Sequence, residues 1–348
     1  MGIKNYFLNK SNSYRFYKEQ YEKYILPNKN NKNQVSNDLK KEIQQLRDEM
    51  ELQKKYMDST NDLFNVLFLD YKHESIGILK NIHLLCTELL EFVNNICKAN
   101  DLNWWLDYGT LLGGIRHNYF IPWDDDTDIG MMREDYLKFD KIIHEEVKKH
   151  KIDDIIKLQY KQRKFKGEII GSFLLIFLRD YLPNGDYPIL AGIDVFPYDY
   201  IKTKPDITSE EYQRHYFLTK KELFQNIYDE MDEDKRLKIV YDKLDLTFDR
   251  QKYILPGVEG ACGPYNLYDL MLLEDDKLFP LKETKFGDKV FPVPHDYDHH
   301  LKTIYGDYMS VPKTVHAHSR VNKLRYNINN DEIFERSLKR LKEVNETY

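Results

Sequence analysis

The chain has 348 residues, of which 41% are hydrophobic, 14% aromatic and 32% charged. This content can bury at least one sizeable core, and the 27 tyrosines and 18 phenylalanines exclude a chain that is disordered through low hydrophobicity. The formal net charge of −6 argues against a nucleic-acid-binding protein, which needs a basic surface to neutralise phosphates.

The cysteines and the hydropathy pattern indicate a cellular compartment. Cys86, Cys97 and Cys262 show no CxxC spacing, so we expect neither a disulfide framework nor a zinc cluster. No run of about 18 apolar residues is present, and the first residues lack the apolar core of a signal peptide. The sequence therefore predicts a cytoplasmic protein that does not span a membrane.

Residues 1–33 form a basic, aromatic arm with seven Lys or Arg against two Glu. Two interpretations stay open. The arm can bind an anionic membrane surface peripherally, at the inner face of the membrane, or it can be a solvated segment packed on its own domain or on a partner subunit.

Residues 34–70 predict a heptad-type helix. Apolar side chains recur at heptad spacing, and Gln53 interrupts the seam; the apolar positions are Leu39, Ile43, Leu46, Met50 and Met57. The pattern fits a coiled coil between two copies, which would give a homo-oligomer. It fits equally well an amphipathic helix that lies on the body of the protein.

The pattern of residues 71–325 predicts an α/β (α+β) catalytic domain, with a mixed sheet flanked by helices. The pattern of residues 326–348 predicts a C-terminal helix. The domain is expected to begin with a core helix, a strand, a glycine-rich turn into a helix, and a second strand, at residues 76–96, 104–106, 111–116 and 129–132. Buried strands at 169–178 and 193–196 follow, and the charged stretch at 208–250 predicts a helical insertion. A hairpin around Gly287 and helices at 295–305 and 331–344 complete the pattern.

Two chemical features stand side by side between Trp104 and Gly130. Gly109 and Thr110, between a strand and a helix, can present backbone N–H groups and a helix N-terminus to a phosphate. Asp126 and Asp128 point to the same face of a strand because strand side chains alternate. Converging carboxylates repel each other unless a cation lies between them, and hard oxygen ligands favour Mg²⁺ or Mn²⁺. A lone DxD is common in loops, but four aspartates within residues 124–128 beside a glycine turn favour a metal site.

This segment resembles the signature of the LicD family, which includes bacterial phosphocholine transferases and animal phosphoribitol transferases of the fukutin type. The resemblance rests on a GTLLG turn at Gly109–Gly113, Arg116, the run from Ile121 to Ile129, and the pair Asp135-Tyr136. It extends over residues 75–315. It implies a nucleotidyltransferase fold whose sheet carries the catalytic carboxylates.

The family pattern also implies a third carboxylate. The run Gly192–Pro197 resembles the family's IDIFP element, which makes Asp194 a metal ligand and catalytic residue together with Asp126 and Asp128. From the residues alone, an aspartate inside an apolar strand is costly unless it is paired, and this favours a functional role.

Further residues around this centre are predicted to bind the donor: Gly109, Thr110, Arg116, Asp107 and Asp124. Arg116 offers a guanidinium fork that fits a phosphate, although an ion pair with Asp124 or Asp125 explains it equally well. A polar cluster at His316, His318 and Arg320 either contacts substrate or belongs to an exposed tail.

The resemblance implies a metal-dependent transferase that moves a phosphorylated alcohol, such as phosphocholine or phosphoribitol, from a CDP-linked donor to a hydroxyl of a cell-surface or lipid-linked glycan. One alternative is a nucleotide-sugar glycosyltransferase, which also uses a DxD motif to hold a metal. In those enzymes the DxD usually follows a long nucleotide-binding region, whereas here a glycine turn closely precedes it. A second alternative is a non-catalytic adaptor for surface-polymer enzymes, against which the intact carboxylates argue.

Overall fold

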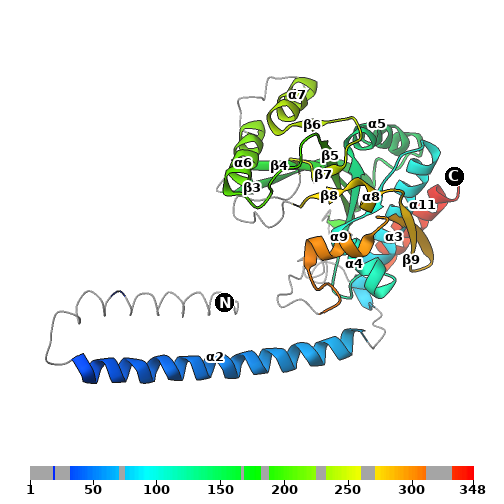
Figure 1. Cartoon of the computed structure of the whole chain (residues 1–348). Helices are drawn as coiled ribbons and strands as arrows, with labels where there is room; N and C mark the ends of the chain where they lie inside the picture. Colours follow the sequence, from blue (N-terminus) through cyan, green and yellow to red (C-terminus); the bar gives the residue numbers. More distant parts are fainter. Residues whose placement is uncertain are drawn as a thin grey trace. The chain divides into compact units, whose positions relative to one another are not determined.

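The computed structural model (Figure 1) describes residue 19 and residues 32–69, 75–165, 168–181, 188–224, 233–259, 271–310 and 331–348. The chain divides into two compact units, Met1–Val66 and Leu67–Tyr348. Most of the predicted basic arm at residues 1–33 lies outside the described residues. Among the described helices, none combines the length and the apolar character needed to cross a bilayer.

The helix predicted at residues 34–70 is present as α2 (Lys32–Leu69), which has 38 residues. Leu39, Ile43 and Leu46, on the predicted seam, are partly buried. Further along the helix Met50 is 53% exposed and Leu63 is 58% exposed. Pairing of this helix with a second copy stays a prediction.

In the described part of the second unit, the central feature is an eight-stranded mixed sheet. Its main path follows the order β1-β2-β5-β4-β3, made of β1 (Trp105–Leu106), β2 (Thr127–Met132), β5 (Ile189–Ile201), β4 (Glu168–Arg179) and β3 (Ile156–Phe165). β2 and β5 are parallel, whereas the other three pairs are antiparallel. The end of β5 also pairs with β6 (Leu246–Thr247) and β7 (Tyr253–Pro256), and β7 pairs with β8 (Leu273–Glu274).

The strand β5 is central because its sequence, ILAGIDVFPYDYI, can be buried on both faces. All its residues from Leu190 to Ile201 are buried. Its charged residues are Asp194 and Asp199, and each of these needs compensation in such a place. Asp199 obtains it from Arg133, whose Nη2 lies 2.7 Å from Asp199 Oδ2.

Side chains along β2 and β5 point alternately to the two faces of the sheet, and each face packs against a different layer of the molecule. The odd-numbered residues, such as Ile129 and Val195, belong to the main core, which also contains α3 (Gly77–Ala99). α3 packs against β5, α5 (Arg133–Lys149) and α11 (Asp331–Asn345). The even-numbered residues face the other side, where Phe196 and Tyr198 form a second core cluster. Asp128 and Asp194 have the same parity, so they belong to this second face.

The predicted helical insertion contains two helices, α6 (Glu210–Phe224) and α7 (Glu233–Leu244), and ends in the strand β6. α6 packs on β4 and on α7, and the two helices share a small core with β6 and β7. After β8, the chain forms α8 (Asp275–Leu278), the predicted hairpin β9 (Lys282–Phe286) and β10 (Lys289–Val293), and α9 (Tyr297–Tyr305). Gly287 turns this hairpin with a φ of +65°.

The mixed α/β architecture predicted from the sequence is confirmed. The strand β3 was not predicted, because its sequence IKLQYKQRKF is mostly polar. β3 is at one end of the main strand path and pairs with β4. Edge strands bury little apolar surface, so their hydrophobic signal is weak. The helix predicted at 111–116 is also longer, since α4 spans Tyr108–His117.

Replacing Gly130 with alanine should destabilise the fold. A Cβ at Gly130 would lie 2.4 Å from Trp105 Cε2, and Trp105 is fully buried against Tyr198 and Phe279, so its ring has little room to shift. We expect the free energy of unfolding to fall by about 1–3 kcal/mol in urea denaturation. Gly192→Ala in the neighbouring strand is the control, because its nearest contacts lie at an ordinary 3.5 Å. Equal effects of the two substitutions would contradict this account.

Candidate active site

Two of the three carboxylates predicted as metal ligands lie on the two parallel strands, and the third comes just before β2. Asp128 is the second residue of β2, Asp126 comes two residues before it, and Asp194 lies in β5. The register of the parallel pair places Asp128 directly opposite Asp194. Because adjacent strands are about 4.8 Å apart and the two residues share a face, their side chains are neighbours.

The negatively charged carboxylates of this cluster repel one another. Burial and the carboxylates of Asp126 and Asp194 raise the pKa of Asp128 well above its usual value, with further contributions from Asp124 and Asp107. Burial and the charge of Asp126 likewise raise the pKa of Asp124. A cation bound here would remove this repulsion.

The glycine turn packs directly on the carboxylates. A Cβ at Gly109 would lie 2.8 Å from Asp124 Oδ2 and 3.8 Å from Asp128 Oδ2, so a side chain there would collide with Asp124. Thr110 is buried, and its Oγ1 accepts a hydrogen bond of 2.8 Å from the backbone N–H of Asp128. The turn and the strand that carries Asp128 are therefore tied together.

Asp107 is the N-cap of α4, with its carboxylate directed into the protein. Asp107 is fully buried. Its Oδ1 accepts a hydrogen bond of 2.9 Å from the backbone N–H of Tyr108 and lies 2.9 Å from His300 Nε2. Its Oδ2 accepts a hydrogen bond of 2.5 Å from the Tyr198 hydroxyl. Its own N–H donates to Asp128 O at 3.0 Å. These contacts make Asp107 a positioning residue for the turn, while direct donor binding by its side chain stays a prediction.

Arg116 connects α4 with the segment after α9. Its Nη1 donates to the carbonyl oxygen of Tyr308 at 2.7 Å and its Nε to His117 Nε2 at 2.9 Å. Among the described residues it forms no ion pair with Asp124 or Asp125, so that alternative explanation of Arg116 is not seen. Its predicted contact with a phosphate stays a prediction.

His83, which the sequence analysis missed, supports the aspartate loop from α3. Its Nε2 is 2.7 Å from the carbonyl oxygen of Asp124, its Nδ1 is 2.9 Å from Ser75 Oγ, and its ring stacks on Phe120 with centroids 4.1 Å apart. Burial lowers its pKa to about 4, so at neutral pH the ring is uncharged and can donate one hydrogen bond and accept another. A lone histidine inside the apolar pattern of α3 was the signal available in the sequence.

Tyr305 is a second residue that the sequence analysis did not assign to the site. It is the last residue of α9, which packs against α4. Tyr305 is 41% exposed, and partial burial together with the charges of Asp128 and Asp107 raises the pKa of its hydroxyl above the usual value. The hydroxyl therefore stays protonated and can donate a hydrogen bond beside the carboxylates. His316, His318 and Arg320 lie outside the described residues.

The donor chemistry fits a hard divalent cation, since the converging side chains all offer carboxylate oxygens. Within the described residues, however, no three His, Cys, Asp or Glu side chains are already arranged as a metal-binding group. The metal assignment of Asp126, Asp128 and Asp194 therefore stays a prediction, which rests on the strand register and the mutual repulsion of these charges.

Comparison with known proteins shows a sequence similarity to one family over the segment that carries these residues. The model of the LicD/FKTN/FKRP nucleotidyltransferase domain matches residues 101–225, which contain β1, α4, β2 and β5. The lipopolysaccharide cholinephosphotransferase LicD of Haemophilus influenzae is 24% identical over 252 residues, which is 67% of this chain and 92% of that protein. Residues 101–225 therefore carry a domain of the LicD type, as the sequence predicted.

Other relatives match only a short segment of the chain. The human and mouse ribitol 5-phosphate transferase FKRP are each 42% identical over 48 residues, or 14% of this chain and 10% of those proteins. A protein of Rickettsia typhi is 41% identical over 56 residues, which is 16% of this chain and 18% of that protein. As the sequence predicted, the chain is an enzyme of the phosphotransferase class.

The low pKa of His83 predicts a specific pH dependence of stability. The unfolded chain binds a proton at His83 below about pH 6.5, while the folded chain does so only near pH 4. Stability should therefore fall as the pH drops through this window, by roughly 3 kcal/mol at its lower end.

His83→Gln should show a shallower loss of unfolding free energy between pH 7 and pH 4 in urea titrations. His144→Gln, at an exposed position on α5, is the control and should keep the wild-type slope. Parallel curves for all three proteins would show that His83 does not carry this pH dependence.

Proposed function

We propose that this enzyme transfers a phosphorylated alcohol, such as phosphocholine or phosphoribitol, from a CDP-linked donor to a hydroxyl of a glycan. The observation that supports this most strongly is the register of β2 and β5, which sets Asp128 opposite Asp194 beside the turn of Gly109 and Thr110. The relatives named for cholinephosphate and ribitol 5-phosphate transfer support the class of group that is moved.

In this proposal, Asp126, Asp128 and Asp194 hold Mg²⁺ or Mn²⁺, which would neutralise the charge on the donor phosphates. The first turn of α4 offers N–H groups that have no partner inside the helix, and these would bind a phosphate oxygen. Arg116 on the same helix would add a cation near the phosphates.

The reaction is a substitution at phosphorus. The acceptor hydroxyl forms a new P–O bond, the bond between that phosphorus and CMP breaks, and CMP leaves with the electron pair. The hydroxyl proton passes to a carboxylate of the cluster, for which Asp194 is our candidate. The Tyr305 hydroxyl would donate a hydrogen bond to the reacting phosphate, since its raised pKa keeps its proton in place.

Similarity to the LicD family disfavours the two alternatives. A nucleotide-sugar glycosyltransferase would break a sugar–oxygen bond and release a nucleoside diphosphate, whereas the proposed enzyme releases a monophosphate. An idle adaptor would have no need of mutually repelling carboxylates, which cost stability without a bound partner. A cytoplasmic location and peripheral membrane contact through residues 1–33 remain part of the proposal.

A nucleotide-release assay tests the function. CDP-choline, CDP-ribitol, CDP-glycerol and common nucleotide sugars are offered with a mixed glycan acceptor, and the expected product is CMP. Asp126→Asn should reduce release by roughly 100-fold or more, because it removes a charge aimed at the reacting centre. The control, Asp288→Asn in the exposed β9–β10 turn, should retain wild-type activity. Release of UDP or GDP from a nucleotide sugar would replace this function with glycosyl transfer.

Metal removal gives an independent prediction. Chelation with EDTA should abolish CMP release, and Mg²⁺ or Mn²⁺ should restore it, whereas Ca²⁺ should restore it poorly because its preferred ligand distances are longer. Undiminished release in EDTA would show that the carboxylates act without a metal.

A further inference from the structure

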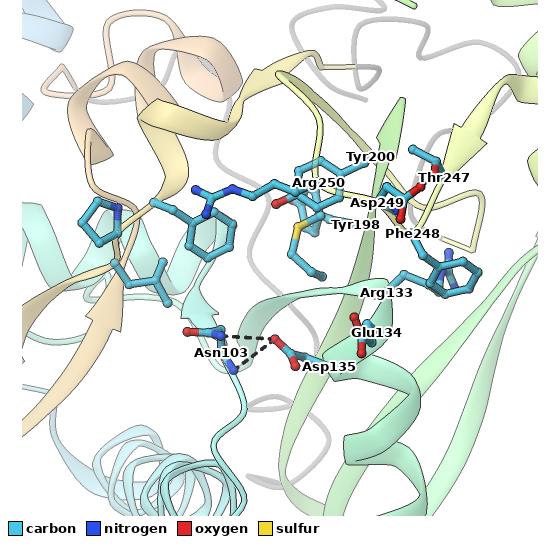
Figure 2. A pocket seen from close by; sticks show the side chains of 14 residues that line it. Asn103, Arg133, Glu134, Asp135, Tyr198, Tyr200, Thr247, Phe248, Asp249 and Arg250 are labelled. Carbon is cyan, nitrogen blue, oxygen red and sulfur yellow. Dashed lines mark hydrogen bonds between the residues drawn. The ribbon is translucent and has the colours of Figure 1, made fainter. Parts of the chain in front are cut away.

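A pocket of about 710 Å³ has none of Asp126, Asp128 and Asp194 in its lining. Figure 2 shows the side chains that line it. Its lining comes from the end of β2 and the start of α5, from β5, and from the segments that follow β6 and α8. This volume is within the range of small-molecule sites. No step of the proposed reaction uses it.

The pocket and the carboxylates are on the same side of the sheet. Met132 lines the pocket and is four residues after Asp128, and Tyr198 and Tyr200 line it four and six residues after Asp194. Even spacing keeps these side chains on one face. Four residues of strand cover about 13 Å, so a ligand in the pocket would be separate from the reacting phosphate.

The charges of the pocket disfavour a phosphate or nucleotide ligand. Arg133 is buried between Asp199 and Glu259, with nitrogen–oxygen distances of 2.7 Å to each. Arg250 is 2.7 Å from Asp275, which also accepts a hydrogen bond from Tyr200. Both guanidinium groups are thus matched by carboxylates that do not line the pocket, and no surplus positive charge is left for an anion.

The pocket instead offers hydrogen-bond acceptors. Asp135 Oδ2 accepts from the backbone N–H and the side-chain amide of Asn103 at 3.2 and 3.4 Å (Figure 2). In the described part of the chain, neither Asp135 Oδ1 nor the Asp249 carboxylate has a donor. A carboxylate has about four lone-pair sites, so both can accept hydrogen bonds from hydroxyl groups.

Aromatic rings complete the lining. Phe248 is 47% exposed, and the Phe279 ring is held by the Arg250 guanidinium, 5.7 Å from the ring centroid. The ring of Tyr200 is fixed through its hydrogen bond to Asp275. Fixed rings give flat apolar surfaces at little entropic cost. A ligand that suits this pocket has an apolar face and several hydroxyl groups, and it carries no charge.

We infer that this pocket is a glycan subsite, which binds one sugar unit of the acceptor at a distance from the hydroxyl that reacts. The inference rests on the proposed function, because it assigns the pocket to the acceptor of that reaction. Asp135 and Asp249 accept hydrogen bonds from the sugar hydroxyls, and Phe248 and Phe279 contact the apolar face of the ring.

Saturation-transfer NMR tests the binding without requiring turnover. Methyl glycosides of glucose, galactose and N-acetylglucosamine are the probes, and choline is included as a small cation. The variants are Asp249→Ala and Phe248→Ala, both at exposed positions, with Asp242→Ala on α7 as the matched control outside the pocket. Thermal unfolding of each variant checks that the fold is kept.

At least one glycoside should give a signal with the wild type and with Asp242→Ala, and the two pocket variants should weaken its binding about tenfold. In the nucleotide-release assay, the pocket variants should raise KM for a polymeric glycan by a similar factor and leave kcat unchanged. No glycoside signal, a signal from choline alone, or signals equal in all variants would overturn the inference.

The two proposals can fail separately. If no donor releases CMP but the glycoside signal depends on Asp249 and Phe248, the sugar site stands and the proposed reaction falls. If CMP release is strong but the pocket variants behave as wild type with every glycan and glycoside, the reaction stands and the subsite falls.

Discussion

Parallel pairing between β2 and β5 is the constraint on which the site depends. It sets Asp128 opposite Asp194 on a largely buried face, with Asp126 nearby. Like charges in such surroundings oppose folding, and burial and repulsion together raise the pKa of Asp128. The rest of the site can be understood as a way to hold these groups in place until a compensating ligand binds.

Much of that support comes from segments that are distant in sequence. His300 on α9 is 193 residues from Asp107 and pairs with it, while Tyr198 reaches the same carboxylate from β5. Asp107 in turn caps α4 and binds the backbone of Asp128. Buried hydrogen-bond networks of this kind are costly when one member is lost, so they fix a single arrangement.

The family match covers residues 101–225, but the site is completed by parts of the chain outside it. His83 on α3 forms a hydrogen bond with the carbonyl oxygen of Asp124. On α9, the pKa of the Tyr305 hydroxyl is raised by the nearby charges of Asp128 and Asp107. The matched segment thus carries the charged groups, and the flanking helices orient them. The same sheet face continues to the pocket, whose walls are fixed by the ion pairs of Arg133 and Arg250.

The sequence by itself determined the chemical groups of the site and the type of fold. Three local patterns carried this information: the glycine turn, the aspartates at 124–128 and the aspartate inside an apolar strand. They can be interpreted from local sterics, from the alternation of side chains along a strand and from the cost of burying a charge. The tertiary structure alone decided that Asp107 turns inward to His300 and Tyr198, that Arg116 donates to backbone carbonyls, and that β3 adds to the sheet. Each of these depends on contacts between residues far apart in the chain, which periodicity and spacing cannot report.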